Sequence, residues 1–102
     1  MQIEAEQQNG RLRLVLAGNL DERGAEELKK YLTGVTPEQN PEVVFDCSRV
    51  EHFGSSCIGK LLVFYKRYTS GGGKMAVNNL PSPIYEMFLE LKLDTLFPVS
   101  KF

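Results

Sequence analysis

The sequence contains no tryptophan, a single histidine and two cysteines in 102 residues. Cys47 and Cys57 are too few for a disulfide framework, and their spacing matches no zinc-binding motif. His52 alone offers little for a catalytic base or a metal centre. We therefore expect no metal, no cofactor and a reducing compartment, the cytoplasm.

An excess of one charge and long apolar segments are also absent. The formal net charge is −1, so no basic field favours nucleic acid. No apolar run approaches the ~20 residues of a membrane-spanning helix, and residues 1–10 lack the basic start and apolar core of a secretory signal. We expect one domain, residues 1–102, with neither a membrane nor a nucleic-acid partner.

Alternating apolar and polar residues predict a β-hairpin at the beginning of the chain. Ile3–Gln7 and Arg11–Ala17 both alternate with period two, and Asn9-Gly10 between them is typical of a tight turn. Later strands are predicted from short runs, of which the first is apolar on both faces as in an inner strand. These later runs are Val43–Phe45, Lys74–Val77 and Leu96–Val99.

Three segments have the spacing of amphipathic helices. The first follows Asp21, whose side chain can cap a helix, and ends at Gly34. The second begins at Ser55 and ends at the glycines after Ser70, and the third begins with a capping Ser82. The expected buried residues are, in order, Ala25, Leu28 and Leu32; Ile58, Leu61, Leu62, Tyr65 and Tyr68; and Ile84, Met87, Phe88 and Leu91.

The order of predicted elements is β-β-α-β-α-β-α, followed by a tail. Helices that connect successive strands indicate parallel pairing through right-handed crossovers after the antiparallel hairpin. The simplest fold is of the α/β class, with a mixed four- to five-stranded β-sheet and α-helices packed on it.

Two adjacent serines, Ser55 and Ser56, stand at the beginning of the second predicted helix. The first helical turn leaves amide groups unpaired, and the helix dipole adds about half a positive charge there. One serine is sufficient to cap the helix, and cap statistics favour this interpretation of the pair. A phosphate on the second serine would instead place about −1.5 to −2 charges where anions are stabilised. The residues alone leave both possibilities open.

Other chemistry at these residues has weaker support. A nucleophilic serine would need His52 as its base, but a triad also needs an orienting acid and an oxyanion hole, so a hydrogen-bonded, partly buried histidine is favoured. Cys57 near a helix N-terminus could have a lowered pKa, although a packed, unreactive thiol is the simpler interpretation. The segment 71–74 fails the spacing of a phosphate-binding loop. We expect no enzymatic activity and a solvated helix face at Lys60, Lys66 and Arg67.

The segments Asp46-Cys47-Ser48 and Val50–Gly59 resemble the signature of STAS domains of the anti-sigma-factor antagonist type. That signature has an aspartate and a serine at a strand end, then apolar residues, Asp-Ser-Ser/Thr-Gly and an aliphatic residue. The resemblance extends to residues 18–28, to Lys74–Asn79 and to Leu91–Val99, which is nearly the whole chain. It implies a STAS-like fold.

The resemblance also implies a function. In that family the second serine is phosphorylated by a partner serine kinase that often doubles as an anti-sigma factor. Ser56 aligns with this serine, Ser55 is the second choice, and Asp21 matches an aspartate of the early loop. The chain is expected to be a bacterial regulator of transcription that binds an anti-sigma factor or kinase, with a phosphatase as a further partner. The expected partner surface comprises Asp21, Gly54, Ser55, Ser56, Cys57 and Lys60.

Two residues depart from the family signature. Gly54 stands where the family usually has aspartate, and Cys57 stands where it usually has glycine. The lost carboxylate bears on kinase recognition, and the thiol adds bulk beside the acceptor serine. A second function therefore stays open, that of a constitutive STAS adaptor in a transporter or signalling complex, without phosphorylation. In either case we expect a monomer.

Overall fold

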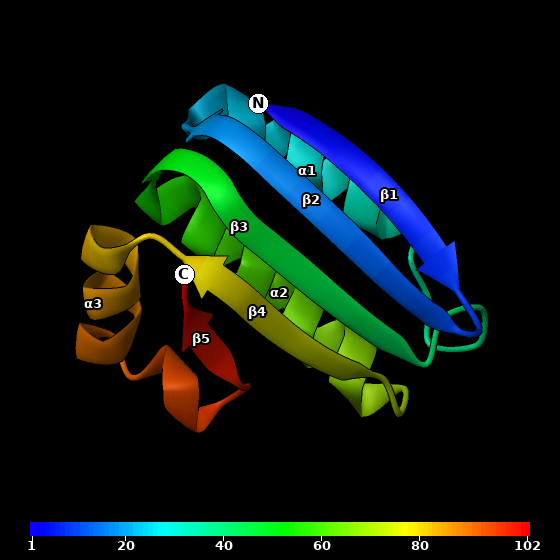
Figure 1. Cartoon of the computed structure of the whole chain (residues 1–102). Coiled ribbons are helices and arrows are strands. Elements are labelled where there is room, and N and C mark those ends of the chain that lie inside the picture. The colour runs from blue at the N-terminus through cyan, green and yellow to red at the C-terminus, as the bar shows by residue number, and fades with distance from the viewer.

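The computed structural model describes residues 1–102 and contains one mixed five-stranded sheet (Figure 1). The strands are β1 (Gln2–Gln8), β2 (Arg11–Leu20), β3 (Glu42–Phe53), β4 (Lys74–Leu80) and β5 (Val99–Lys101). The helices are α1 (Glu22–Thr33), α2 (Ser55–Ser70) and α3 (Ser82–Glu90), with a 3-10 turn, η1, at Leu93–Thr95. The strands lie in chain order, with β1 antiparallel to β2 and every later pair parallel. The α/β fold predicted from the sequence is confirmed.

Helices α1 and α2 lie side by side behind the sheet, while α3 and η1 lie beside its β4–β5 end (Figure 1). Two successive right-handed crossovers place their helices on the same face of a parallel sheet. The alternating leucines of β2 point into the layer between sheet and helices, where Leu14 is fully buried. The helix stripes supply the other half of this core.

The face of the sheet opposite the helices carries charged side chains together with the buried Val15 and Val44, and it contains one buried carboxylate, Asp46. Arg13 binds both Asp46 and Glu6, while Asp46 also accepts hydrogen bonds from the Ser48 amide (3.0 Å) and the Asn79 side chain (3.2 Å). Burial alone would raise the pKa of Asp46, but these donors and the guanidinium hold it below its ordinary value. This network ties β1, β2, β3 and β4 together across the face.

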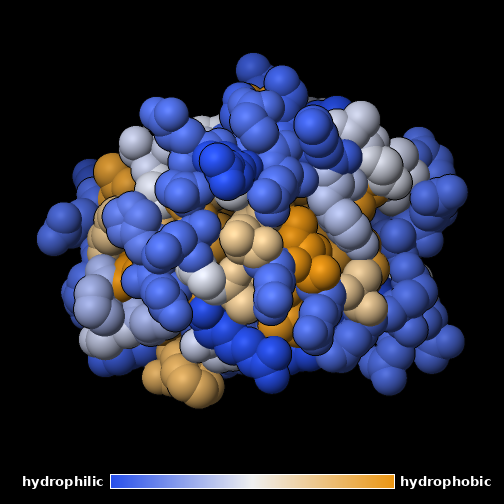
Figure 2. Space-filling model, turned by 90° about the horizontal axis from the view of Figure 1, so that it is seen from above, coloured by the Kyte–Doolittle hydropathy of each residue, from blue (hydrophilic) through white to orange (hydrophobic).

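Strand β1 forms one edge of the sheet and is poorly covered. Ile3 faces the helix layer but is only half-buried, and Ala5 on the same side is exposed. Figure 2 shows the molecule from above, the side on which β1 and the beginning of α1 lie in Figure 1. It shows an apolar area surrounded by hydrophilic residues.

Several predicted boundaries are wrong. Strand β3 continues through polar residues to Phe53 instead of ending near Asp46, and β5 begins at Val99 instead of Leu96. Helix α3 has Pro81 at its N-cap, so Ser82 is already helical and does not cap it. Leu91 is the C-cap of that helix and is 52% exposed, so the prediction that it belongs to the buried face is wrong.

Candidate functional site

The N-termini of α1 and α2 are neighbours because the strands that precede them are paired. Leu20 at the end of β2 is aligned with Phe53 at the end of β3, and the Gly54 amide donates a hydrogen bond to the Leu20 carbonyl (2.8 Å). The fold therefore brings Asp21 next to Gly54 and the two serines, as expected if they form one surface.

The N-terminus of α1 is closed by its own side chain. Asp21 occupies the N-cap and accepts a hydrogen bond from the Gly24 amide (2.9 Å). This hydrogen bond holds the pKa of Asp21 below its ordinary value. The predicted cap is confirmed, and the carboxylate stays ionised at neutral pH.

The N-terminus of α2 is open. Gly54 occupies the N-cap with extended backbone (φ −78°, ψ 160°), and no side chain caps the first turn. Ser55 and Ser56 are the first two residues of the helix, so the interpretation of the pair as a cap is wrong. A capping side chain must come from the residue with extended backbone, and glycine has none. The first amides of α2 are left free of side-chain acceptors.

Close packing explains glycine at position 54. A Cβ atom there would lie 2.9 Å from the Leu20 carbonyl oxygen and 3.6 Å from Nε2 of His52. The first distance is shorter than the contacts that Cβ atoms make in proteins, so the backbone would have to move to accommodate any larger residue. The family's usual aspartate therefore does not fit this position without a shift.

Cys57 lies inside the protein and not on the expected partner surface. Its side chain is 0% exposed, and Sγ lies 3.6 Å from the Asp21 carbonyl oxygen. Burial, together with the Asp21 carboxylate, raises the pKa of this thiol to about 11. The packed thiol is confirmed and the lowered pKa is wrong, because the side chain lies in the core. A side chain buried in this way offers a partner no direct contact, in contrast to its place in the expected partner surface.

Two shallow depressions meet at Ser56, which is half-buried. One, of about 430 Å³, lies between the two helix N-termini, and the other, of about 470 Å³, runs along the groove between α1 and α2. The first is lined by Asp21, Gly54, Ser55 and Ser56 among the predicted residues, and the second by Ser56 and Lys60. Apart from Cys57, the predicted partner residues are thus brought together around Ser56.

Sequence reasoning missed four residues of this surface. Glu22 lines both depressions, Glu26 forms an ion pair with Lys60 (3.6 Å), and Met87 reaches the first depression from α3. Val63 is 70% exposed on α2. Only Val63 carried a usable signal, since it is a large aliphatic residue outside the buried stripe of its helix. Glu22 and Glu26 carry no such signal, because acidic residues are common on solvent-exposed helix faces.

The remaining chemistry at this end of the molecule is sparse. His52 is exposed, which contradicts the expected partial burial, and no hydrogen bond joins it to Ser55 or Ser56. No group of three or more histidine, cysteine, aspartate or glutamate side chains is arranged to hold a metal ion. None of the helices is both long enough and apolar enough to cross a membrane.

Comparison with known proteins identifies the family. The anti-sigma F factor antagonist of Paenibacillus polymyxa is 26% identical over 100 residues, which cover 97% of this chain and 86% of that protein. An anti-sigma factor antagonist from Mycobacterium paratuberculosis has a similar structure, with a TM-score of 0.86, 24% identity and coverage of 99% of this chain and 86% of that one. The phosphorylated form of the Bacillus cell fate determinant SpoIIAA gives a TM-score of 0.76, 16% identity and coverage of 96% and 90%. A family model described as "Mlab, STAS domain" matches residues 3–98, and the chain therefore belongs to the STAS domain family.

Proposed function

We propose that this protein is a non-enzymatic, cytoplasmic regulator of the anti-sigma-factor antagonist type, formed by a single domain and acting as a monomer. Its partner is an anti-sigma factor that is also a serine kinase, bound through the surface around Ser56, Asp21 and Lys60. Phosphorylation of Ser56 releases the partner, and a phosphatase restores binding. The curated relative named as an anti-sigma F factor antagonist, which aligns over almost the whole chain, supports this assignment.

The open N-terminus of α2 is the observation that carries the proposal. Ser56 lies in its first turn, on the surface where two depressions meet, and no side chain caps the free amides beside it. A phosphoryl group on Ser56 would be stabilised by these amides and by the helix dipole, so the fold would tolerate it. The phosphorylated structure of SpoIIAA, which has a similar fold, supports this view.

The effect on binding follows from charge. Asp21, Glu22 and Glu26 line the two depressions that meet at Ser56, and Lys60 is engaged by Glu26. Phosphorylation would add close to two negative charges to an acidic interface. A desolvated charge without a partner costs several kcal/mol, and each 1.4 kcal/mol changes affinity tenfold. We expect binding to fall by about a hundredfold or more, with little change in fold.

A second candidate is the constitutive adaptor, for which Gly54 is the specific observation. The family's usual aspartate is absent, and a larger residue at this position would require the backbone beside the Leu20 carbonyl to shift. A kinase that reads that carboxylate would not recognise this chain. The protein would then bind its partner, such as a transporter or signalling subunit, independently of Ser56.

Treatment with the anti-sigma-factor kinase and ATP, followed by intact mass measurement, separates the two candidates. We expect one phosphate on the wild type and on Ser55→Ala, and none on Ser56→Ala. Since neither serine caps α2, both alanine variants should fold, and the pair forms a matched control. An unmodified wild type would favour the constitutive adaptor, and phosphate on Ser56→Ala would contradict the assignment of the site.

A further inference from the structure

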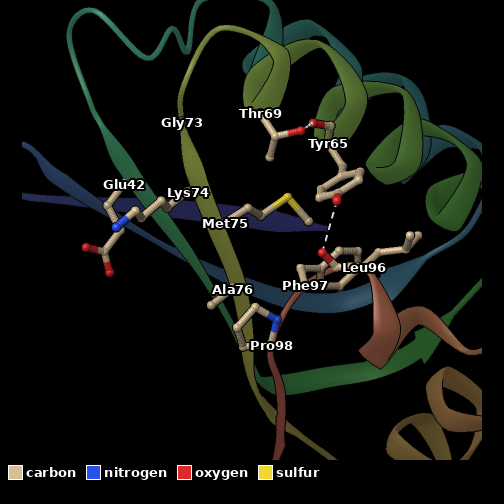
Figure 3. Close-up of a pocket in the computed structure, with 10 residues that line it drawn as sticks. All are labelled: Glu42, Tyr65, Thr69, Gly73, Lys74, Met75, Ala76, Leu96, Phe97 and Pro98. Carbon is tan, nitrogen blue, oxygen red and sulfur yellow. Dashed lines mark hydrogen bonds between the residues drawn. The ribbon is translucent and has the colours of Figure 1, made fainter.

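A groove of about 400 Å³ lies where β4 and β5 diverge, and its lining shares no residue with the depressions around Ser56 (Figure 3). Tyr65, Leu96 and Phe97 form its wall on the helix side, and Met75 points toward Tyr65 from β4. Leu96 is 46% exposed there. Lys74 and Ala76 line the groove from the opposite face of the sheet. The groove therefore wraps around the edge of a strand.

The backbone of Met75 has no strand partner at this edge. The Lys74 amide donates to the Pro41 carbonyl on the β3 side, while the Val77 amide donates to the Pro98 carbonyl on the β5 side (both 2.9 Å). Successive residues of a strand direct their backbone groups to opposite neighbours, so Met75 is directed away from β3. Its neighbour β5 first pairs with β4 at Val77. One amide and one carbonyl of Met75 are thus directed toward the groove, where the residue as a whole is 5% exposed.

Two features stop the β4–β5 ladder before Met75. Pro98 precedes the first paired residue of β5 and has no amide hydrogen to donate. The Leu96 carbonyl, the next acceptor along the chain, instead accepts a hydrogen bond from the Tyr65 hydroxyl (3.0 Å). In Figure 3 the segment that precedes Pro98 lies away from β4, and a dashed line joins the Leu96 carbonyl to the Tyr65 hydroxyl. These contacts keep the chain before β5 from pairing with Met75.

We propose that this open edge of β4 binds an extended segment of a partner protein as an additional short strand. The segment exchanges backbone hydrogen bonds with Met75, which selects an extended chain as the occupant. Side chains of an added strand alternate between the faces of the sheet. One side chain of the segment therefore enters the groove between Tyr65 and Phe97, and this side chain is apolar. The next side chain lies on the opposite face of the sheet, beside Lys74.

Charge defines the second position of the segment. Lys74 forms no ion pair, and Glu42, which is aligned with it on β3, pairs with Arg11 (3.3 Å). An acidic side chain beside Lys74 would complete this row of alternating charges. The expected segment therefore alternates apolar and acidic residues, and its binding does not depend on the state of Ser56.

A blocked hexapeptide of alternating valine and glutamate is the probe, titrated into the ¹⁵N-labelled full chain and followed by NMR. We expect a saturable shift of the Met75 amide, slower exchange of its hydrogen with solvent, and a dissociation constant of about 1 mM, because few groups are engaged. The same peptide methylated on every backbone nitrogen should not bind. No saturable shift, shifts centred elsewhere, or equal binding of the methylated peptide would overturn the proposal.

Two charge variants test the second position without altering the core. Lys74→Glu should bind the valine–glutamate peptide about tenfold more weakly than the wild type does. This variant should bind a valine–lysine peptide instead. Lys66→Glu makes the same charge change on an exposed part of α2 outside the groove, and should bind as the wild type does. An equal loss of affinity in both variants would show a general charge effect and contradict docking beside Lys74.

Discussion

The N-termini of α1 and α2 lie side by side but are built differently. Asp21 caps α1 and is held ionised by the Gly24 amide. Gly54 begins α2 without a cap, and both serines lie within its first turn. Both ends have the same unpaired amides and the same dipole, so the difference lies in the residue that precedes each helix.

This difference separates a structural helix end from one that is available to a ligand group. The carboxylate of Asp21 already occupies the anion-binding position of α1. No side chain occupies the corresponding position on α2, which lies beside Ser56. A phosphate or a partner's carboxylate can therefore be accommodated at α2 but not at α1.

Replacing Cys57 should give the largest loss of stability. Its buried thiol contacts the Asp21 carbonyl and so joins the two helix ends. Cys57→Gly, which introduces the family's usual residue, should lower the free energy of unfolding by about 2–3 kcal/mol through the lost packing and the added backbone freedom. Urea denaturation measures this loss. A change below about 0.5 kcal/mol would mean that the contact does not hold the two ends together.

Filling position 54 tests whether the open end of α2 is imposed by packing. Gly54→Ala should lower the free energy of unfolding by about 1–3 kcal/mol, because its Cβ approaches the Leu20 carbonyl. Gly54→Asp should lower the free energy of unfolding by about 1 kcal/mol less than Gly54→Ala does, since its carboxylate caps the helix. The same urea experiment compares both variants. If Gly54→Ala is as stable as the wild type, packing does not explain the glycine.

Neutralising Asp21 tests the closed end. Because the pKa of Asp21 is lowered in the folded protein, its contribution to stability is present above the pKa of the unfolded chain, about 4, and is lost as pH falls through the folded value. Asp21→Asn should therefore be less stable than the wild type at neutral pH, and the two should converge below about pH 4. Thermal unfolding from pH 7 to pH 3 measures this. Parallel curves across the range would contradict an ionised cap.

The order of elements in the fold could be predicted because each element has a strong local pattern. The leucines of β2 alternate without interruption, and Asp21 and Gly34 mark both ends of α1. Boundaries were wrong where tertiary contacts override the local pattern. Strand β3 continues through Asp46 because Arg13 and Asn79 satisfy its buried carboxylate, and neither partner is near it in the sequence.

The site was predictable only in part for a similar reason. The signature located Ser56 and Asp21, and the paired strands bring them together. The direction of the Cys57 side chain and the absence of a serine cap both depend on which residue begins α2. If the helix began one residue later, Ser55 would be the N-cap and Cys57 would point in another direction. No sequence pattern reports the 2.9 Å approach between the Leu20 carbonyl and a Cβ at Gly54.

We propose that charge at Ser56 controls partner binding. Titration calorimetry of the anti-sigma-factor kinase against unmodified protein, protein phosphorylated at Ser56, Ser56→Asp and the matched Ser55→Asp tests it directly. We predict that phosphorylation weakens binding by about a hundredfold or more, and that Ser56→Asp weakens it less because a carboxylate carries less charge. Ser55→Asp should have the smallest effect. Equal affinity of the unmodified and phosphorylated proteins would contradict the account.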